Sequence, residues 1–140
     1  MAMTIHLDIV SAERGIFSGQ AEMVFAPAVM GEVGIAPRHA PLITRLKPGE
    51  VRAHLPNGKG ESFYVSGGIL EVQPHIVTVL SDTVVRAHDI DEAAAQTAKE
   101  RAEQAMQNHS SEMEYAAAEA ALAEASAQLA LLNRRKQKRH

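Results

Sequence analysis

All nine glycines and all six prolines of this 140-residue chain lie at or before Pro74, so the last 66 residues contain neither. Glycine and proline occur in turns and are excluded from helix interiors. A turn-rich first part is therefore followed by a stretch in which nothing interrupts a helix. The composition changes at the same place, because about a third of the residues from Asp89 to Leu132 are alanine, the strongest helix former. The sequence predicts two different parts, 1–87 and 88–140.

The first part contains short stretches in which polar and apolar residues alternate. In residues 4–9, period two places Ile5, Leu7 and Ile9 on one face of an extended strand. The intervals between these stretches hold turn residues and are too short for crossover helices, which disfavours a parallel α/β fold. Seven or more strands at this spacing predict an antiparallel β-sandwich or a flattened barrel. The predicted strands are 4–9, 21–26, 42–46, 51–55, 62–66, 69–73 and 75–81.

The second part holds two helix starts of the same type. Asp89–Glu92 and Ser111–Glu114 both fit the capping box, in which the first side chain bonds the N3 amide and the N3 glutamate reaches back. Between them, Asn108 is suited to the left-handed conformation that ends many helices. The sequence therefore predicts an antiparallel helical hairpin, with helices at about 90–107 and 112–135.

A regular row of residues on the second predicted helix, here called the hairpin seam, repeats at spacings of three and four, as in a coiled coil. Alanine buries much less apolar surface than leucine, so packing along this seam should be weak. Two interpretations stay open. The helices either persist while docking weakly, and so move between alternative partners, or form a fixed, close-packed pair. The seam consists of Tyr115, Ala118, Leu122, Ala125, Leu129 and Leu132.

Charge is distributed unevenly along the second part. Residues 88–133 carry 2 cationic and 9 acidic residues, a balance of 2 − 9 = −7, whereas the last residues form a basic end. This end could contact nucleic acid or anionic lipid, or it could complement the negative C-terminal end of the helix before it. The overall net charge of −3 is too mild to predict a nucleic-acid or membrane partner. The basic end consists of Arg134, Arg135, Lys136, Lys138 and Arg139.

Catalytic and metal-binding patterns are weak in this sequence. The seven histidines are scattered without the spacing of a helical metal site, and there is no cysteine, so no metal site is predicted. Ser66, His39 and Asp82 could form a catalytic trio only by chance, because no G-x-S-x-G elbow accompanies them. The Ser66-Gly67-Gly68 segment lacks the lysine of a phosphate-binding loop. An enzyme is therefore not expected.

Targeting and membrane segments are also not predicted. Residues 1–10 alternate polar and apolar residues and lack the uninterrupted apolar core of a signal peptide. No apolar run approaches the roughly 18 residues of a membrane span. We therefore expect a soluble protein, or one that is peripheral through a partner.

Three stretches of sequence carry a family resemblance that covers essentially the whole chain. Gly31–Leu42 (GEVGIAPRHAPL), Tyr64–Pro74 (YVSGGILEVQP) and the Ile90-Asp91-Glu92-Ala93 segment resemble the epsilon subunit of F-type ATP synthases. The start, Met1–Asp8, is most similar to the proteobacterial form. Chance is a poor explanation for two long, family-specific stretches in the first part.

The resemblance implies a non-catalytic subunit of the central stalk, or rotor. In that family a β-sandwich of about ten strands binds the gamma subunit and the ring of membrane c subunits, and it couples ring rotation to the catalytic head. The helical hairpin either folds against the sandwich or extends into the hexamer of alpha and beta subunits, where it inhibits ATP hydrolysis. Such a chain would lie at the cytoplasmic face of the bacterial inner membrane, peripheral through its proton-translocating complex, and would not bind nucleic acid.

Three residues of the sandwich are implied by the resemblance to contact partners. Glu32 matches the family position that faces the polar loops of the c ring, and His39 lies in the segment near gamma. Arg38 departs from the glycine that the family usually has before the histidine, which suggests a locally different backbone or an added cation at the stalk interface.

Nucleotide binding is implied to be weak or absent, so no cofactor is expected. Some family members bind ATP on the folded hairpin through an Ile/Leu-Asp-x-x-Arg-Ala motif supported by further arginines, whose guanidinium groups suit phosphates. Here Ile90 and Asp91 are kept and Arg101 matches one supporting arginine. The motif arginine is Ala94, however, and two more supporting positions are Glu124 and Gln128.

One alternative from another functional class remains. The chain could be an unrelated β-sandwich binding module whose helical tail serves for dimerisation. Association separates the two hypotheses. The first predicts a complex with gamma, and the second predicts self-association through the hairpin seam.

Overall fold

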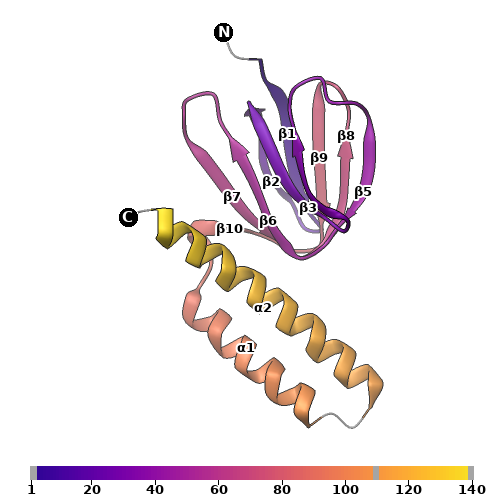
Figure 1. Ribbon diagram of the computed structural model, residues 1–140, viewed down its shortest axis with the longest axis vertical. Helices are drawn as coiled ribbons and strands as arrows, with labels where there is room; N and C mark the ends of the chain where they lie inside the picture. The colour runs from indigo at the N-terminus through magenta and orange to yellow at the C-terminus, as the bar shows by residue number, and fades with distance from the viewer. Residues whose placement is uncertain (1–2, 109–110, 139–140) are drawn as a thin grey trace. The chain divides into compact units, whose positions relative to one another are not determined.

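The computed structural model describes residues 3–108 and 111–138. The chain divides into two compact units, Met1–Ala87 and His88–His140. Strands make up the first unit and two α-helices make up most of the second (Figure 1).

Within residues 3–87 the first unit contains ten strands, which confirms the prediction of seven or more and the number implied by the resemblance. Three of them had no predicted range. The additional strands are β2 (Gly15–Ala21), β4 (Gly31–Ile35) and β10 (Val84–Arg86). Each of the seven predicted stretches overlaps one of the others. These are β1 (Ile5–Ser11), β3 (Met23–Ala28), β5 (Leu42–Leu46), β6 (Gly49–His54), β7 (Gly60–Val65), β8 (Gly68–Val72) and β9 (Ile76–Ser81).

Hydrogen bonds connect the strands in the order β10-β7-β6-β3-β5-β8-β9-β1-β2, with β4 on β3. β3 and β5 pair only at Ala28 and Leu46 within the described residues, so the sheet consists of two five-stranded halves. The halves form the expected sandwich, but one pairing is not antiparallel as predicted. β1 runs parallel to β9. Seven strands separate the two in sequence, so this parallel pair needs no crossover helix.

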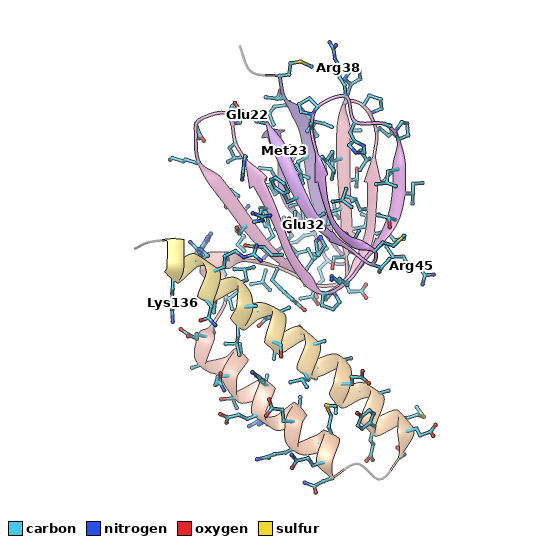
Figure 2. The ribbon with its side chains drawn as sticks, in the orientation of Figure 1. Glu22, Met23, Glu32, Arg38, Arg45 and Lys136 are labelled. Carbon is cyan, nitrogen blue, oxygen red and sulfur yellow. The ribbon has the colours of Figure 1, made fainter. Side chains whose placement is uncertain are left out.

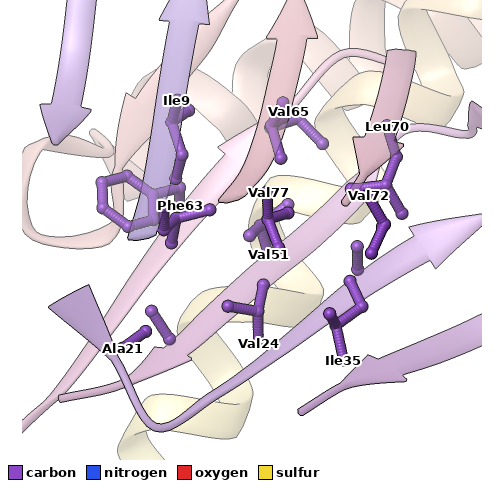
Figure 3. Packing of buried hydrophobic residues seen from close by; sticks show 14 of the residues in the cluster. Ile9, Ala21, Val24, Ile35, Val51, Phe63, Val65, Leu70, Val72 and Val77 are labelled. Carbon is purple, nitrogen blue, oxygen red and sulfur yellow. The ribbon is translucent and has the colours of Figure 1, made fainter. Parts of the chain in front are cut away.

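The core of this unit lies between the two halves of the sheet. Ile5, Leu7 and Ile9 are fully buried on β1, which confirms the face predicted from their alternation. Val77 and Val79 on β9 repeat the same spacing, and residues of β3, β6 and β7 close the core from the other half (Figure 3). Burial of this continuous apolar cluster is the main stabilising contribution to the sandwich.

The backbone where β7 is followed by β8 requires glycine at two positions. Gly67 and Gly68 adopt φ values of +120° and +121°, and a Cβ at Gly68 would collide with the carbonyl oxygen of Leu80. The hydroxyl of Ser66 accepts a hydrogen bond from the amide of Thr83 at 3.1 Å. Ser66-Gly67-Gly68 is thus a tight connection between strands.

A short 3₁₀ helix (Ala87–Asp89) spans the boundary between the two units in the sequence, and α1 (Glu92–Gln107) and α2 (Glu112–Lys138) follow in the second unit. The N-cap of α1 is Asp91, whose carboxylate accepts from the amide of Ala94 at 3.1 Å. The predicted cap at Asp89 was therefore wrong by two residues. For α2 the predicted cap is confirmed, because the Ser111 hydroxyl accepts from the amide of Glu114 at 3.1 Å.

The helix ends also differ from the prediction. Asn108 ends α1 with φ −114°, which is not the left-handed conformation, and its amide donates to the carbonyl of Gln104. α2 continues to Lys138 rather than ending near Arg135. Among the described residues, none of the helices is both long and apolar enough to cross a membrane.

Candidate functional site

The turn between β3 and β4 presents the residue that the resemblance places at the c ring. Ala28 pairs with Gly31, which leaves Val29 and Met30 at the tip, and Met30 is 95% exposed. The amide of Val29 donates to the carbonyl of Arg45 at 3.0 Å. The turn of one half of the sheet is therefore tied to β5 of the other half.

Glu32 follows this turn on β4 and belongs to a group of charged and aromatic side chains. Its carboxylate accepts a hydrogen bond from Nη2 of Arg52 at 2.9 Å. The guanidinium of Arg52 also lies 4.6 Å from the ring centroid of Phe25, and its Nε is 3.8 Å from the Glu50 carboxylate. We call Phe25, Glu32, Glu50 and Arg52 the Glu32 cluster. Sequence reasoning found Glu32 but not its partners.

Arg38 and His39 lie in the loop between β4 and β5. Arg38 has φ 65°, the left-handed conformation that glycine adopts most easily. Its amide donates to the carbonyl of Pro74 at 2.9 Å, and Nδ1 of His39 lies 2.7 Å from the carbonyl oxygen of Ala40. Arg38 and Glu32 lie toward opposite ends of the sandwich (Figure 2). The structure thus keeps these predicted contact residues apart.

A polar ladder on β1 and β2 was missed by sequence reasoning. The Ser18 hydroxyl donates to the Asp8 carboxylate at 2.7 Å, and Nε2 of His6 is 2.9 Å from the same oxygen. The Ser18 hydrogen bond lowers the pKa of Asp8, partial burial opposes this shift, and His6 adds to it. The pairing of Asp8 with Ser18 across the strands was not readable without knowing that β2 is a strand.

In the second unit, α1 and α2 enclose a groove of about 910 Å³. Eight of its lining residues are alanines, and the polar ones are Asp91, Thr97, Arg101, Asn108 and Glu114. Asp91 and Arg101 of the nucleotide motif are therefore brought to the same groove, whereas Ile90 is half-buried and does not line it. Among the described residues, the groove presents one cation and two carboxylates, which is a poor set of charges for a polyphosphate.

The hairpin seam is buried mainly at its alanines. Ala118 and Ala125 on α2 are buried, as are Ala95 and Ala102 on α1, and each pair is seven residues apart. Leu122, Leu129 and Leu132 are half-buried. Tyr115 is exposed, and the buried leucine near the end of α2 is Leu131. The seven-residue spacing of Ala95 and Ala102 on α1 is a signal in the sequence that could have predicted this contact.

The basic end is partly described. Nζ of Lys136 lies 2.8 Å from both carboxylate oxygens of Glu92, so the end of α2 is joined to the start of α1. Arg134 is exposed and Arg135 is half-buried. Arg139 and the side chain of Lys138 lie outside the described residues. Over the described part of the chain, no group of three or more histidine, aspartate or glutamate residues could hold a metal ion.

Comparison with known proteins agrees with both units. The beta-sandwich domain of the ATP synthase delta/epsilon chain matches residues 4–87, and the long alpha-helix domain of the same chain matches residues 88–133. The chain belongs to the ATP synthase delta/epsilon family. The resemblance drawn from the sequence motifs is confirmed.

Individual members of the delta/epsilon family extend the comparison. The chain is 66% identical over 138 residues to the ATP synthase epsilon chain of Nitrosococcus oceani, covering 99% of each. It is 56% identical over 140 residues to that of Nitrosomonas europaea, covering 100% of each. A chain in the mitochondrial ATP synthase of Euglena gracilis has the same fold, with a TM-score of 0.84 and 23% identity over 92% of this chain and 81% of that one.

Proposed function

We propose that this chain is a non-catalytic rotor subunit in the central stalk of a proton-translocating F-type ATP synthase. It couples rotation of the c ring to the catalytic head, and its helical hairpin inhibits ATP hydrolysis. The observation that carries the proposal is the match of both units, over nearly the whole chain, to the delta/epsilon family at up to 66% identity to an epsilon chain. In this role the chain lies at the cytoplasmic face of the bacterial inner membrane and meets the membrane only through the complex.

The sandwich serves as the body that contacts two partners. Glu32, beside the exposed tip of the β3–β4 turn, faces the c ring, and Arg38 and His39 lie at the gamma interface. The separation of Glu32 from Arg38 supports this assignment, because one small body can then contact two partners at once (Figure 2). Nucleic acid is not a partner.

The hairpin serves as the regulatory element that extends into the alpha and beta subunits. Contacts made by Ala95, Ala102, Ala118 and Ala125 bury little side-chain surface. The Lys136–Glu92 ion pair is more than half exposed on both sides, and such pairs contribute about 0.2–1 kcal/mol. Because the contacts between α1 and α2 are weak, the hairpin can adopt more than one arrangement of its helices, and a regulatory signal can shift the balance between them. The cations of the basic end then meet an acidic segment of a beta subunit.

Direct ATP sensing by the hairpin is not part of the proposed function. The groove that holds Asp91 and Arg101 contains one cation and two carboxylates, and Asp91 is already used as the cap of α1. We expect no ATP binding at millimolar concentration. Calorimetry on the isolated chain checks this, and a submillimolar dissociation constant would contradict it.

Truncation of the chain tests the regulatory role. A chain ending at His88 lacks both α-helices, so the reconstituted synthase should hydrolyse ATP faster while coupling stays largely intact. A second truncation after Asn133 removes the basic end together with the last residues of α2 and the Lys136–Glu92 ion pair, and it keeps α1 and the rest of α2. Unchanged hydrolysis with both truncations would remove the inhibitory role and leave the coupling role standing.

Self-association tests the alternative of a binding module with a dimerisation tail. Sedimentation of the full chain should give a monomer that forms a complex with gamma. Two results together would favour the alternative. The chain would form a dimer that is lost when the exposed Tyr115 face of α2 is substituted, and it would not bind gamma.

A further inference from the structure

Arg52 connects three strands on the outer face of the sandwich. It lies on β6 opposite Phe25 of β3, and Phe25 in turn lies opposite Gly34 of β4. From this position the guanidinium crosses β3 to reach Glu32, two residues before Gly34 on the same face of β4. The contact therefore depends on strand order and not on closeness in sequence.

The side chain of Arg52 is held from several directions. Its guanidinium lies 4.6 Å from the centroid of Phe25, and only 20% of the side chain is exposed. Gly34 makes room for this arrangement, because a Cβ there would lie 3.0 Å from the methyl carbon of Met23 and 3.2 Å from a ring carbon of Phe25. The Phe25 ring also lies 5.5 Å from the ring of His54. The ring contact and the low exposure restrict the side chain of Arg52, although its buried Nε has no hydrogen-bond partner among the described residues.

The two carboxylates of the Glu32 cluster differ in their exposure to solvent. Glu50 is only 8% exposed and lies 3.8 Å from Nε of Arg52, whereas Glu32 is 50% exposed. The guanidinium of Arg52 thus lies near both carboxylates, and it donates a hydrogen bond to Glu32 at 2.9 Å. The carboxylate of Glu32 is therefore held by Arg52 and is still accessible to a partner.

We propose that Arg52 is a positioning residue that holds the Glu32 carboxylate in one orientation for a partner loop that carries a cation or another hydrogen-bond donor. This inference rests on the proposed contact between Glu32 and the c ring. A long exposed glutamate otherwise samples several rotamers, and ordering it before binding removes part of the cost of association. A guanidinium supplies a planar donor fork for this task, which an ammonium cannot reproduce.

The first test measures orientation in the isolated full-length chain. Scalar couplings that report χ1 of Glu32 should show one rotamer in the native chain and averaged rotamers in Arg52→Met. Arg52→Lys should restore the order in part. The matched control is Arg86→Met, because Arg86 also lies over a phenylalanine, Phe63, and beside a glutamate, Glu61, elsewhere on the sandwich. It should leave the rotamer of Glu32 unchanged.

The second test uses the assembled catalytic complex that contains this chain. It measures how tightly this complex binds to membranes that contain the c ring. Arg52→Met should weaken this binding by roughly threefold or more, as expected for coupled groups. Glu32→Gln should weaken it similarly, and Arg52→Met should add nothing in the Glu32→Gln background. Arg86→Met, compared at equal thermal stability, should bind like the native chain.

Two results would overturn the inference. One is a single Glu32 rotamer in Arg52→Met, and the other is an equal loss of binding from Arg52→Met with and without Glu32→Gln. If Glu32→Gln alone leaves c-ring binding unchanged, the proposed contact of Glu32 fails. The rotamer measurement still decides whether Arg52 positions that side chain.

Discussion

Lys136 near the end of α2 places its ammonium 2.8 Å from both carboxylate oxygens of Glu92 in the first turn of α1. The pair closes the end of the hairpin opposite the loop between the helices, where each helix terminus would otherwise fray. An acidic residue in the first turn and a cation in the last turn also complement the two helix dipoles. The contact therefore favours a closed hairpin in two ways.

The first prediction concerns this ion pair. Lys136→Gln should lower the protection of α1 amides near Glu92 in hydrogen exchange, with a free-energy change of about 1 kcal/mol or less because the pair is exposed. The effect should shrink at 1 M salt, where charges are screened within about 3 Å. Lys99→Gln, on the same hairpin, is the control. Equal exchange in the native chain and Lys136→Gln at low salt would count against the role of this pair.

The second prediction concerns the alanines of the hairpin seam. Ala125 is 2% exposed, so Ala125→Leu should force the helices apart and destabilise the hairpin by about 1–3 kcal/mol. Leucine and alanine have similar helix propensities, and Ala123→Leu at an exposed position is therefore the control. Thermal melting followed by helical circular dichroism measures both. Identical melting of the two variants would mean that Ala125 does not limit the helix separation.

The third prediction concerns the backbone at Arg38. A φ of 65° costs a non-glycine residue about 1–2 kcal/mol. Glycine avoids this cost, but its unfolded chain has a larger conformational entropy, which offsets part of the gain. Arg38→Gly should keep or raise the free energy of unfolding by up to about 1 kcal/mol. Arg38→Val should lower it, since a branched side chain resists this conformation. Urea unfolding compares them, and a valine variant as stable as the glycine variant would be inconsistent with strain here.

The fourth prediction concerns pH and the ladder on β1 and β2. Folding lowers the pKa of Asp8 from its usual 3.8, chiefly through the Ser18 hydroxyl. The stability from ionised Asp8 is therefore fully present above that usual value and is lost as pH falls through the lowered one. Ser18→Ala should cost about 1 kcal/mol at pH 7 and less at about pH 2.5.

Urea unfolding at both pH values provides the measurement for Ser18→Ala. Thr4→Ala removes a hydroxyl that donates to Gln20 instead, and its effect should not change with pH. A cost for Ser18→Ala that stays constant down to pH 2.5 would show that the hydroxyl does not act through ionised Asp8.

Regular patterns in the sequence were sufficient for the core strands and the hairpin. The alternation of Ile5, Leu7 and Ile9 has one physical cause, burial of one face, and it can be read locally. Alanine richness and the cap at Ser111 likewise act within a few residues. These features agree with the structure because each depends on neighbours in sequence.

Features that depend on distant residues could not be predicted in this way. β4 contains Gly31 and Gly34, which weaken a strand prediction, yet Phe25 and Met23 cover the space above Gly34. β2 is an edge strand with few buried positions, so its alternation is weak. The partner of Glu32, 20 residues away on β6, follows only from the order of strands.

The position of the β3–β4 turn determines how a mechanical force would spread through the sandwich. Beside this turn, Ala28 lies opposite Leu46, and this pair is held by two backbone hydrogen bonds, from the amide of Val29 to the carbonyl of Arg45 and from the amide of Lys47 to the carbonyl of Pro27. A push on the tip therefore loads both halves of the sheet together, and the exposed tip cannot bend away as a free hairpin. Under a lateral force, such a body transmits the load between its two halves with little internal deformation.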